Sequence, residues 1–442
     1  EDGAKQFARR FAADVAPLLL NSMLGLLAAS ARGRWVSRRV RQLAFTYVCS
    51  AVEVGSLYKL LKPHLEFVLF ECTLPTMCPT PLDIKRFSED PQEFVRRAHD
   101  PLEDFYEPRA AATALVGDLV RCKGKVVLDP LLQRIASVLE AYQQAPSLET
   151  ARQKDGALCA LGAIADELQS RNNWAPLIAA LLATHVLPDL EQGSPFGILR
   201  CRACETLQRF SEHTAVTEIN QRVCAALLRS LDDPDLPVRV EAFGLVRSLL
   251  ASDVGQFDQL LRPHLGTLLD ACFRVMREAA SDDVVQALEI VVDRYGKDIA
   301  PYAVALAQKL AEAFHAYAGE DDDEEASMAA VQCVEAMAAV LASLDDNENN
   351  VYAQLEPYLR PVLHRVFEES GEFLEYFENG IEVVSYLTYH GSTPFSDELW
   401  SLFDQMIRAF HGFACDYIAE LVPSLDNFVS RDTEKFLASS RL

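Results

Sequence analysis

The sequence predicts an all-α fold, a HEAT-repeat α-solenoid in which antiparallel helix pairs stack into a right-handed superhelix. Apolar residues recur every three or four positions along nearly the whole chain, as in RVCAALLRSL and VRVEAFGLVRSLL. No stretch alternates apolar and polar residues over the length of a strand. Helix pairs also recur at a regular interval, so residues 1–442 are expected to form a single continuous solenoid.

The clearest helix pair runs from Leu227 to Leu250. A first helix is expected to end before Asp232, Asp233 and Pro234, which turn the chain. Pro237 then opens the second helix, where the missing N–H of proline costs nothing. The Asp residues are suited to accept hydrogen bonds from the free N–H groups at that helix start.

Weaker copies of this pair share its ingredients, an Arg or Asp close to a small and then a large apolar residue. The markers of the successive copies are Arg109, Asp155, Arg202, Arg239 and Asp283. Their spacing is roughly 37 to 47 residues, the period of two-helix HEAT repeats. About nine pairs fit in the chain at that period.

Residues 71–108 break the pattern and are expected to form an irregular segment between repeats. The pairs Asp90-Pro91 and Asp100-Pro101 are each expected to cap and restart a short helix. Three aromatic residues are expected to anchor these helices to adjacent repeats, namely Phe94, Phe105 and Tyr106. The charged residues between them are expected to face water or each other, namely Arg96, Arg97, Glu103 and Asp104.

Residues 319–327 contain six consecutive acids and are expected to form an exposed loop within one repeat, because like charges repel one another. Two interpretations of this acidic loop stay open, a solubilising insertion and a contact for a basic partner. The candidate cargo-binding residues are Glu320, Asp321, Asp322, Asp323, Glu324 and Glu325. A second polar stretch, Glu378-Asn379-Gly380, is expected to be an isolated turn or a helix cap.

The formal net charge of −24 argues against a nucleic-acid-binding protein, which normally shows a basic surface, and favours basic protein partners. The 11 cysteines are dispersed among apolar helical stretches, which is typical of reduced thiols. The closest pair, Cys201 and Cys204, is expected to be buried within a helix and to bind no metal.

No apolar run reaches the roughly 18 residues of a membrane span. The nearest, APLLLNSMLGLLAAS, is interrupted by Asn21 and Ser22, so no membrane association is expected. The chain begins without an initiator Met in what already reads as an amphipathic helix. It is therefore expected to be an internal fragment of a longer protein.

No catalytic, cofactor-binding or metal-binding residues are predicted. The histidines stand alone, and His185 and His264 are expected to be buried or interfacial and simply hydrogen-bonded. The basic segment, residues 31–42, has two interpretations, a contact for an anion and a solvated helix face with Trp35 buried. The second is favoured.

Five ordered sequence blocks between about residues 60 and 310 carry a family resemblance. They include LKPHLEFVLFECTLPTMC (61–78), EDPQEFVRRAHDPLEDFYEPRAAATAL (89–115) and RQKDGALCALGAIADEL (152–168), followed by HVLPDLEQGSPFGILRCRAC and LDDPDLPVRVEAF. Together they resemble the importin-β (karyopherin) superfamily of nuclear transport receptors, specifically its importin seven and importin eight branch.

The resemblance implies an import receptor that shuttles between cytoplasm and nucleus through the pore in the nuclear envelope. Its partners would be basic cargo proteins, such as ribosomal proteins and histones, and the Phe-Gly repeats of nucleoporins. Ran GTPase would bind to N-terminal repeats of the full-length protein, which this chain lacks. No direct nucleic-acid contact and no cofactor are implied. The alternatives are an export receptor of the same superfamily and a HEAT-repeat scaffold for an enzyme complex.

Overall fold

The computed structural model describes residues 6–7, 10–99, 106–170, 174–212, 219–251, 256–279, 281–318, 324–344, 350–368 and 374–439. Within these ranges the chain forms helices and turns and no strand, which confirms the all-α prediction. The helices form two compact units, Glu1–Phe257 and Asp258–Leu442. A single solenoid over residues 1–442 stays a prediction.

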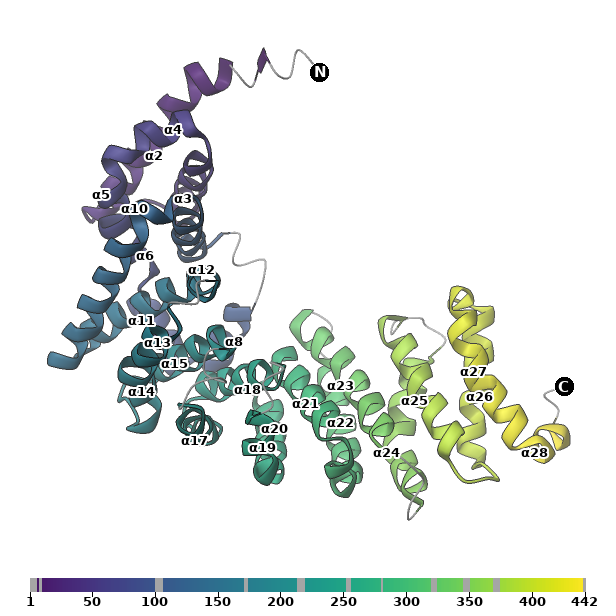
Figure 1. Cartoon of the computed structure of the whole chain (residues 1–442). Helices are drawn as coiled ribbons and strands as arrows, with labels where there is room; N and C mark the ends of the chain where they lie inside the picture. Colours follow the sequence, from purple (N-terminus) through teal and green to yellow (C-terminus); the bar gives the residue numbers. More distant parts are fainter. Residues whose placement is uncertain are drawn as a thin grey trace. The chain divides into compact units, whose positions relative to one another are not determined.

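In the first unit, one layer of helices consists of successive packed neighbours (Figure 1). This layer contains α3 (Arg38–Glu53), α10 (Pro108–Gln144), α11 (Leu148–Ala163), α15 (Gly197–Arg209) and α18 (Leu236–Ala251). The remaining helices are η1 (Phe11–Val15), α2 (Ala16–Ala31), α4 (Gly55–Leu61), η2 (Lys62–His64), α5 (Leu65–Phe67), η3 (Val68–Thr73), α6 (Leu74–Met77), α7 (Pro81–Glu89), α8 (Pro91–His99), α12 (Ala165–Gln169), α13 (Ala175–Leu181), η4 (Leu182–Val186), α14 (Leu187–Glu191) and α17 (Asn220–Ser230).

The helix starts of this unit follow their local sequence. Ser147 and Thr150 form a reciprocal capping box at the start of α11, which satisfies two backbone N–H groups. The clearest predicted pair is confirmed as α17 and α18, with Pro237 in the first turn of α18. The turn between them holds Asp233, whose Oδ1 accepts from the backbone N–H of Asp235 at 3.0 Å.

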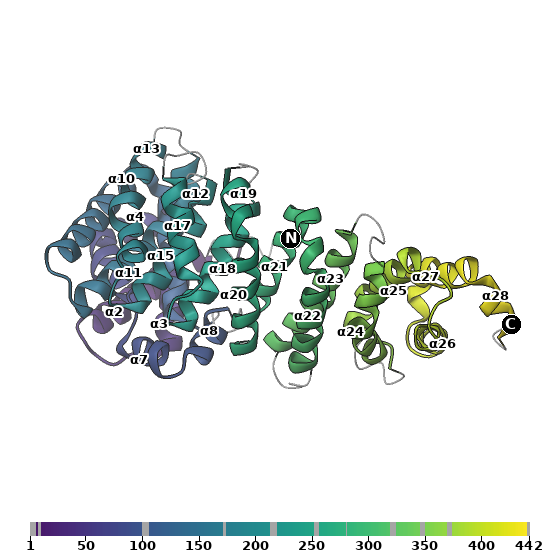
Figure 2. The same ribbon diagram turned by 90° about the horizontal axis from the view of Figure 1, so that it is seen from below.

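The second unit consists of helix pairs in two layers (Figures 1 and 2). One layer contains α21 (Asp282–Tyr295), α23 (Glu324–Ala342), α25 (Phe377–His390) and α27 (Ile418–Arg431). The other contains α20 (Leu265–Glu278), α22 (Ala303–Tyr317), α24 (Val351–Val366) and α26 (Asp397–His411). Shorter elements are η5 (Arg262–His264), η6 (Gly296–Asp298), η7 (Ala300–Tyr302), η9 (Leu374–Tyr376), η10 (Cys415–Tyr417) and α28 (Thr433–Ala438), and α19 (Gln256–Leu261) lies at the boundary between the units.

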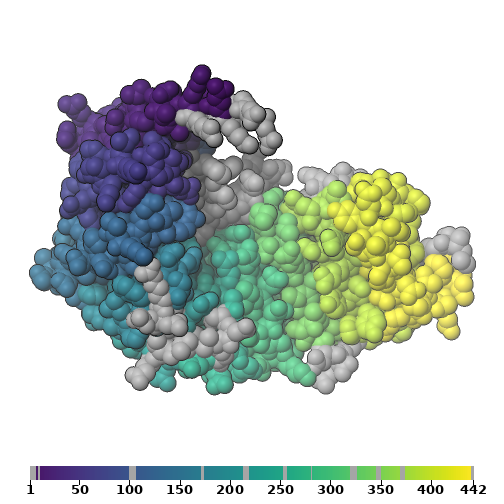
Figure 3. Space-filling model, turned by 45° about the horizontal axis from the view of Figure 1, so that its top comes forward, coloured from purple at the N-terminus to yellow at the C-terminus, as the bar shows by residue number. Residues whose placement is uncertain are grey.

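Every helix of the second unit packs on its partner in the other layer and on the next helix of its own layer. This is the contact pattern of stacked repeats, in which each unit touches only its neighbours. In the space-filling view, the colours of this unit follow one another from green to yellow in the order of the sequence (Figure 3). Its last pairs are closed by aromatic side chains, among them Trp400, whose ring centroid lies 5.0 Å from that of Phe428.

The segment 71–108 is more regular than predicted, because its described part is largely helical from η3 to α8. Asp90 does cap α8, since its Oδ1 accepts from the N–H of Glu93 at 3.3 Å. Phe94 packs edge-on against Phe87 with ring centroids 5.1 Å apart, as an anchor would. Tyr106 is no buried anchor, because it is 58% exposed and the Arg39 guanidinium lies over its ring. The residues of the Asp100-Pro101 pair lie outside the described ranges, as do Glu103, Asp104 and Phe105.

Three further expectations are wrong. Trp35 is 88% exposed in the link between α2 and α3, because the basic segment contains a turn as well as a helix start. His264 is exposed at the end of η5. Glu378-Asn379-Gly380 lies inside the first turns of α25, where Gly380 is required by the close approach of Val366 rather than by a turn.

The apolar N-terminal helix is longer than expected. Phe11–Ala31 is a 21-residue helical stretch of mean hydropathy 1.6, long and apolar enough to cross a membrane. Asn21 and Ser22 do not interrupt it, because the Ser22 hydroxyl donates to the carbonyl of Leu18 at 3.0 Å within the helix. Only 17% of this apolar stretch is buried, and Leu20 and Leu27 are among its buried residues.

Candidate functional site

A ladder of charged side chains connects successive helices of the first unit. The carboxylate of Asp155 on α11 accepts from Arg109 on α10 and from the Nε of Arg202 on α15, the latter at 3.1 Å. The side chain of Asp155 is 1% exposed. Burial has the largest single effect on Arg109 and lowers its pKa, but the Asp155 carboxylate, Cys159 and Glu205 together outweigh it, so the pKa of Arg109 is raised. The three marker residues of successive repeats are therefore in direct contact.

The ladder continues toward α18. The guanidinium of Arg200 donates to Asp233 at 2.7 and 2.9 Å and to Asp235 at 2.8 Å, which ties α15 to the turn before α18. Gln208 Nε2 donates to the carboxylate of Glu241 at 2.8 Å. These bonds fix the stacking of one repeat on the next, because each joins helices that are separated by a full repeat.

Next to Asp155, the side chain of Lys154 is also buried, and it pairs with a different helix. Its Nζ lies 2.7 Å from Asp189 Oδ2, and both side chains are at most 5% exposed. The ammonium also lies 4.5 Å from the ring centroid of Tyr142, whose hydroxyl is 3.3 Å from that of Ser194. Burial raises the pKa of Asp189 to about 6, although Lys154 partly opposes this, and burial lowers the pKa of Lys154.

Gly156 completes this stretch. A Cβ at this position would lie 2.6 Å from Cys78 Sγ and 3.1 Å from its backbone nitrogen, so the residue after α6 packs directly on the backbone of α11. The tripeptide Lys154-Asp155-Gly156 thus holds a buried ion pair, an inter-repeat bridge and a close backbone contact. All three roles are structural.

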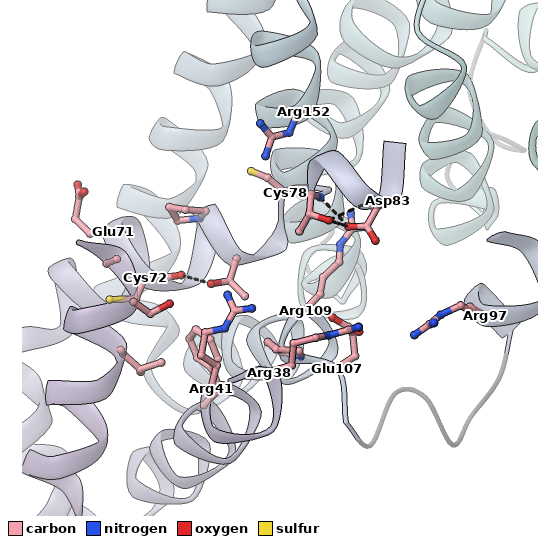
Figure 4. A pocket seen from close by; sticks show the side chains of 18 of the residues that line it. Arg38, Arg41, Glu71, Cys72, Cys78, Asp83, Arg97, Glu107, Arg109 and Arg152 are labelled. Carbon is pink, nitrogen blue, oxygen red and sulfur yellow. Dashed lines mark hydrogen bonds and ion pairs between the residues drawn. The ribbon is translucent and has the colours of Figure 1, made fainter. Parts of the chain in front are cut away.

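Six arginines line one cavity in the first unit (Figure 4). We call this cavity of about 500 Å³ the arginine pocket. It lies among α2, α3, η3, α6, α7, α8, α10 and α11. Its arginines are Arg38, Arg41, Arg86, Arg97, Arg109 and Arg152, and its acidic residues are Glu71, Asp83 and Glu107. In Figure 4, Arg38 and Arg41 lie on one side of the pocket and Arg97 on the other.

Five of these arginines have acidic partners. Arg38 pairs with Glu107, Arg86 with Asp83, Arg97 with Glu93, Arg109 with Asp155 and Arg152 with Glu149. Arg41 has no acidic partner among the described residues, and its buried Nε makes no hydrogen bond there. Burial lowers the pKa of Arg41, and the nearby charge of Arg38 lowers it further. The basic segment at residues 31–42 therefore contributes to a cavity, which the favoured sequence interpretation missed.

An acidic cluster on the α21–α23–α25 layer of the second unit also escaped the sequence reasoning. Burial raises the pKa of Glu289, and the carboxylates of Glu335 and Asp293 raise it further. Glu335 receives a hydrogen bond from Asn379 on α25 at 3.2 Å. Glu289 and Asp293 lie one turn apart on α21, whereas Glu335 on α23 and Asn379 on α25 are distant in sequence and join them only because the helices stack.

The structure does not test the predicted cargo-binding residues. Glu320, Asp321, Asp322 and Asp323 lie outside the described residues, and Glu324 and Glu325 begin α23 with side chains that are likewise not described.

The remaining candidates for chemistry are structural. Cys201 and Cys204 are buried within α15, as predicted, and burial raises both thiol pKa values, that of Cys204 to about 12. Among the described residues no group of three or more His, Cys, Asp or Glu side chains is arranged to hold a metal. His185 is half-buried, and its Nδ1 makes no hydrogen bond among the described residues, whereas a hydrogen-bonded imidazole was expected. Burial lowers its pKa, and the charge of Lys154 contributes.

No protein-family model matches the chain, but several curated proteins do. The Importin beta-like SAD2 homolog of Arabidopsis thaliana is 34% identical over 98% of this chain and 42% of its own length. The probable importin-7 homolog of Dictyostelium discoideum is 30% identical over 91% of this chain and 38% of its own length. Importin-8 of Homo sapiens is 26% identical over 99% and 41%, respectively. The chain thus spans about two fifths of the length of these relatives.

Solved structures of nuclear transport receptors share the fold. The exportin Cse1 in its cargo-free, cytoplasmic state matches with a TM-score of 0.70 at 15% identity, over 95% of this chain and 45% of that one. The Kap95:Nup1 complex contains a chain that matches with a TM-score of 0.56 at 15% identity, over 95% and 54%. These likenesses support the HEAT-repeat helix pairs seen in each unit. The curated relatives, matched over nearly the whole of this chain, show that the chain belongs to the importin-β family.

Proposed function

We propose that the chain is part of a nuclear transport receptor that carries protein cargo through the nuclear pore and shuttles between cytoplasm and nucleus. The observation that carries this proposal is the similarity to the Importin beta-like SAD2 homolog, which extends over 98% of the chain. The described architecture supports it, because stacked helix pairs change curvature by small rotations at each repeat. Such changes are a physical basis for binding cargo in one state and releasing it in another.

We propose import as the direction, with basic proteins such as ribosomal proteins and histones as cargo. Three relatives with importin names support the direction, whereas the exportin Cse1 shares only the fold at 15% identity. The net charge of −24 supports basic cargo, because the field of an acidic chain attracts cationic partners. Phe-Gly repeats of nucleoporins would bind between neighbouring helices, and Ran GTPase would bind to repeats of the longer protein.

Within the second unit, we propose that basic cargo contacts the acidic loop, residues 319–327, and the neighbouring acidic cluster. Glu289 supports this, because its carboxylate is half-buried beside Glu335 and has no cationic partner among the described residues. A lysine or arginine of the cargo would relieve that repulsion. The six loop acids, Glu320 to Glu325, precede or begin α23, the helix that carries Glu335.

A binding assay tests the proposal. The chain is passed over immobilised Phe-Gly repeats and, separately, over a basic ribosomal protein at low and high salt. We expect retention on both, and weaker retention on the ribosomal protein at high salt, because screening reduces contacts between exposed charges. Failure to bind either would contradict a transport role for this part of the protein.

A second variant tests the acidic loop alone. Replacing Asp321, Asp322, Asp323, Glu324 and Glu325 together with Ser is expected to lower the affinity for the basic protein and to leave retention on Phe-Gly repeats unchanged. An unchanged affinity for the basic protein would identify the loop as a solubilising insertion.

A further inference from the structure

The arginine pocket is a positive cavity in an acidic chain, and the transport proposal makes no use of it. Six guanidinium groups and three carboxylates line it, whereas the whole chain carries 41 basic and 65 acidic residues. A protein gains nothing in stability from collecting like charges around a cavity, because each raises the cost of burying the others. Five of the six arginines have acidic partners, so the positive charge left without a counter-charge among the described residues is that of Arg41.

Among the described arginines that line the pocket, Arg41 is the one without an acidic partner. Its buried Nε makes no hydrogen bond, and it forms no ion pair, among the described residues. A buried donor without an acceptor costs about 1–3 kcal/mol, and more when it is charged. The neighbouring Arg38 adds repulsion, because its own partner Glu107 lies on the α10 side. An anion between them would supply the missing acceptor and offset the repulsion.

Two further features favour an anion at this place. Arg86 lies 3.8 Å from Asp83, which is longer than a hydrogen bond, so its donors are not used in that contact. The start of α10, which is helical from Pro108 to a kink at Lys123, also lines the pocket at Pro108, and Glu107 makes no side-chain cap there. The N-terminus of a helix carries a partial positive charge that stabilises anions.

We propose that the arginine pocket binds a compact polyanion, a small molecule that carries several phosphate groups, with Arg41 as a direct contact. The volume of about 500 Å³ lies in the range of small-molecule sites. Guanidinium groups match phosphate oxygens through paired hydrogen bonds, and several arginines from different helices suit phosphates that point in different directions. This inference does not depend on the proposed transport role.

Titration calorimetry at physiological salt tests the proposal, with inositol hexakisphosphate and inorganic tripolyphosphate as probes. We expect one site per chain for at least one probe. Arg41→Gln replaces the charged guanidinium with a neutral amide, and is expected to weaken binding at least about tenfold. Arg34→Gln is the matched control, because Arg34 belongs to the same basic segment but does not line the pocket. It is expected to change affinity less than about twofold.

Thermal melts and a second variant make the test independent of folding. Without ligand, Arg41→Gln is expected to melt no lower than the unaltered protein, because it removes an unpartnered charge. The probe is expected to raise the melting temperature of the unaltered protein and of Arg34→Gln, but not of Arg41→Gln. Ser30→Asp, which places a carboxylate in the pocket lining, is expected to weaken binding as well.

Three results would overturn the proposal. The first is no binding of either probe. The second is an equal loss of affinity in Arg41→Gln and Arg34→Gln, which would indicate general electrostatic attraction. The third is binding of a hexa-aspartate peptide or a single-stranded RNA as tight as that of the phosphate probes, which would indicate a macromolecular partner instead.

Discussion

Arg202 on α15 donates from its Nε to the buried carboxylate of Asp155 on α11 at 3.1 Å. The two residues are the markers of successive repeats in the sequence. The same carboxylate also accepts a hydrogen bond from Arg109, the marker of the preceding copy. The side chain of Asp155 is 1% exposed, so its charge is balanced by two guanidinium groups and very little water. The bond therefore fixes the register of three consecutive helices.

Asp155→Asn is expected to destabilise the first unit by about 3 kcal/mol, because it leaves Arg109 and Arg202 without their shared counter-charge in a buried place. Urea unfolding measures this as a lower transition midpoint with an unchanged slope. Asp166→Asn is the control, because Asp166 is exposed on α12, and it is expected to change stability by less than about 0.5 kcal/mol. A midpoint for Asp155→Asn equal to that of the control would show that the ladder does not hold the repeats together.

The Lys154–Asp189 pair predicts a pH dependence of unusual sign. Burial raises the pKa of Asp189 to about 6 from an ordinary value of 3.8, so the folded state holds this proton more tightly than the unfolded state between these values. The stability contributed by Asp189 therefore falls as the pH rises from about 4 to about 6. Urea unfolding of the unaltered protein and of Asp189→Asn across this range measures it. Between about pH 4 and pH 6, the unfolding free energy of the unaltered protein should fall by about 1–3 kcal/mol relative to that of Asp189→Asn. A difference that stays constant or shifts the other way contradicts this account.

Gly156→Ala is expected to destabilise the first unit by about 1–3 kcal/mol, because the new methyl group would overlap Cys78. Gly25→Ala provides the opposite case. Gly25 lies inside α2 with nothing within 4 Å of a new Cβ, so this variant is expected to gain about 0.5–1 kcal/mol. Thermal melts of the two variants should move in opposite directions, and equal shifts would show that the contact with Cys78 is not tight.

Glu289→Gln is expected to stabilise the second unit by a few tenths of a kcal/mol at neutral pH, because it removes repulsion from Glu335 and Asp293. It is also expected to lower the affinity for a basic ribosomal protein. Glu312→Gln is the control, because Lys309 and Gln308 already bind its carboxylate. If Glu289→Gln binds the basic protein as tightly as the control, the acidic cluster is not part of the cargo contact.

Much of the repeat pattern could be predicted from the sequence, because helix periodicity and capping are local. The pair α17 and α18 and the burial of Cys201 and Cys204 follow from spacing alone. The markers Arg109, Asp155 and Arg202 were found by their period, although their mutual contact was not predicted.

The sites depend on packing and could not be predicted in this way. The arginine pocket gathers side chains from eight helices, and the net charge of the chain, with its excess of acids, gives no sign of it. Lys154 is buried beside Asp189 and Tyr142, partners that lie on other helices and that helix spacing does not identify. Trp35 was expected to be buried because it is apolar and large, but the chain turns there and leaves it exposed.

The proposed transport role requires that the chain bind the Phe-Gly repeats of nucleoporins. The test compares two dissociation constants of the chain, one for a Phe-Gly repeat peptide and one for the same peptide with each Phe replaced by Ser. We predict saturable binding to the Phe-Gly peptide and none to the Ser-Gly peptide, because apolar slots between helices would accept phenylalanine rings. Equal binding of the two peptides, or binding of neither, would contradict the account.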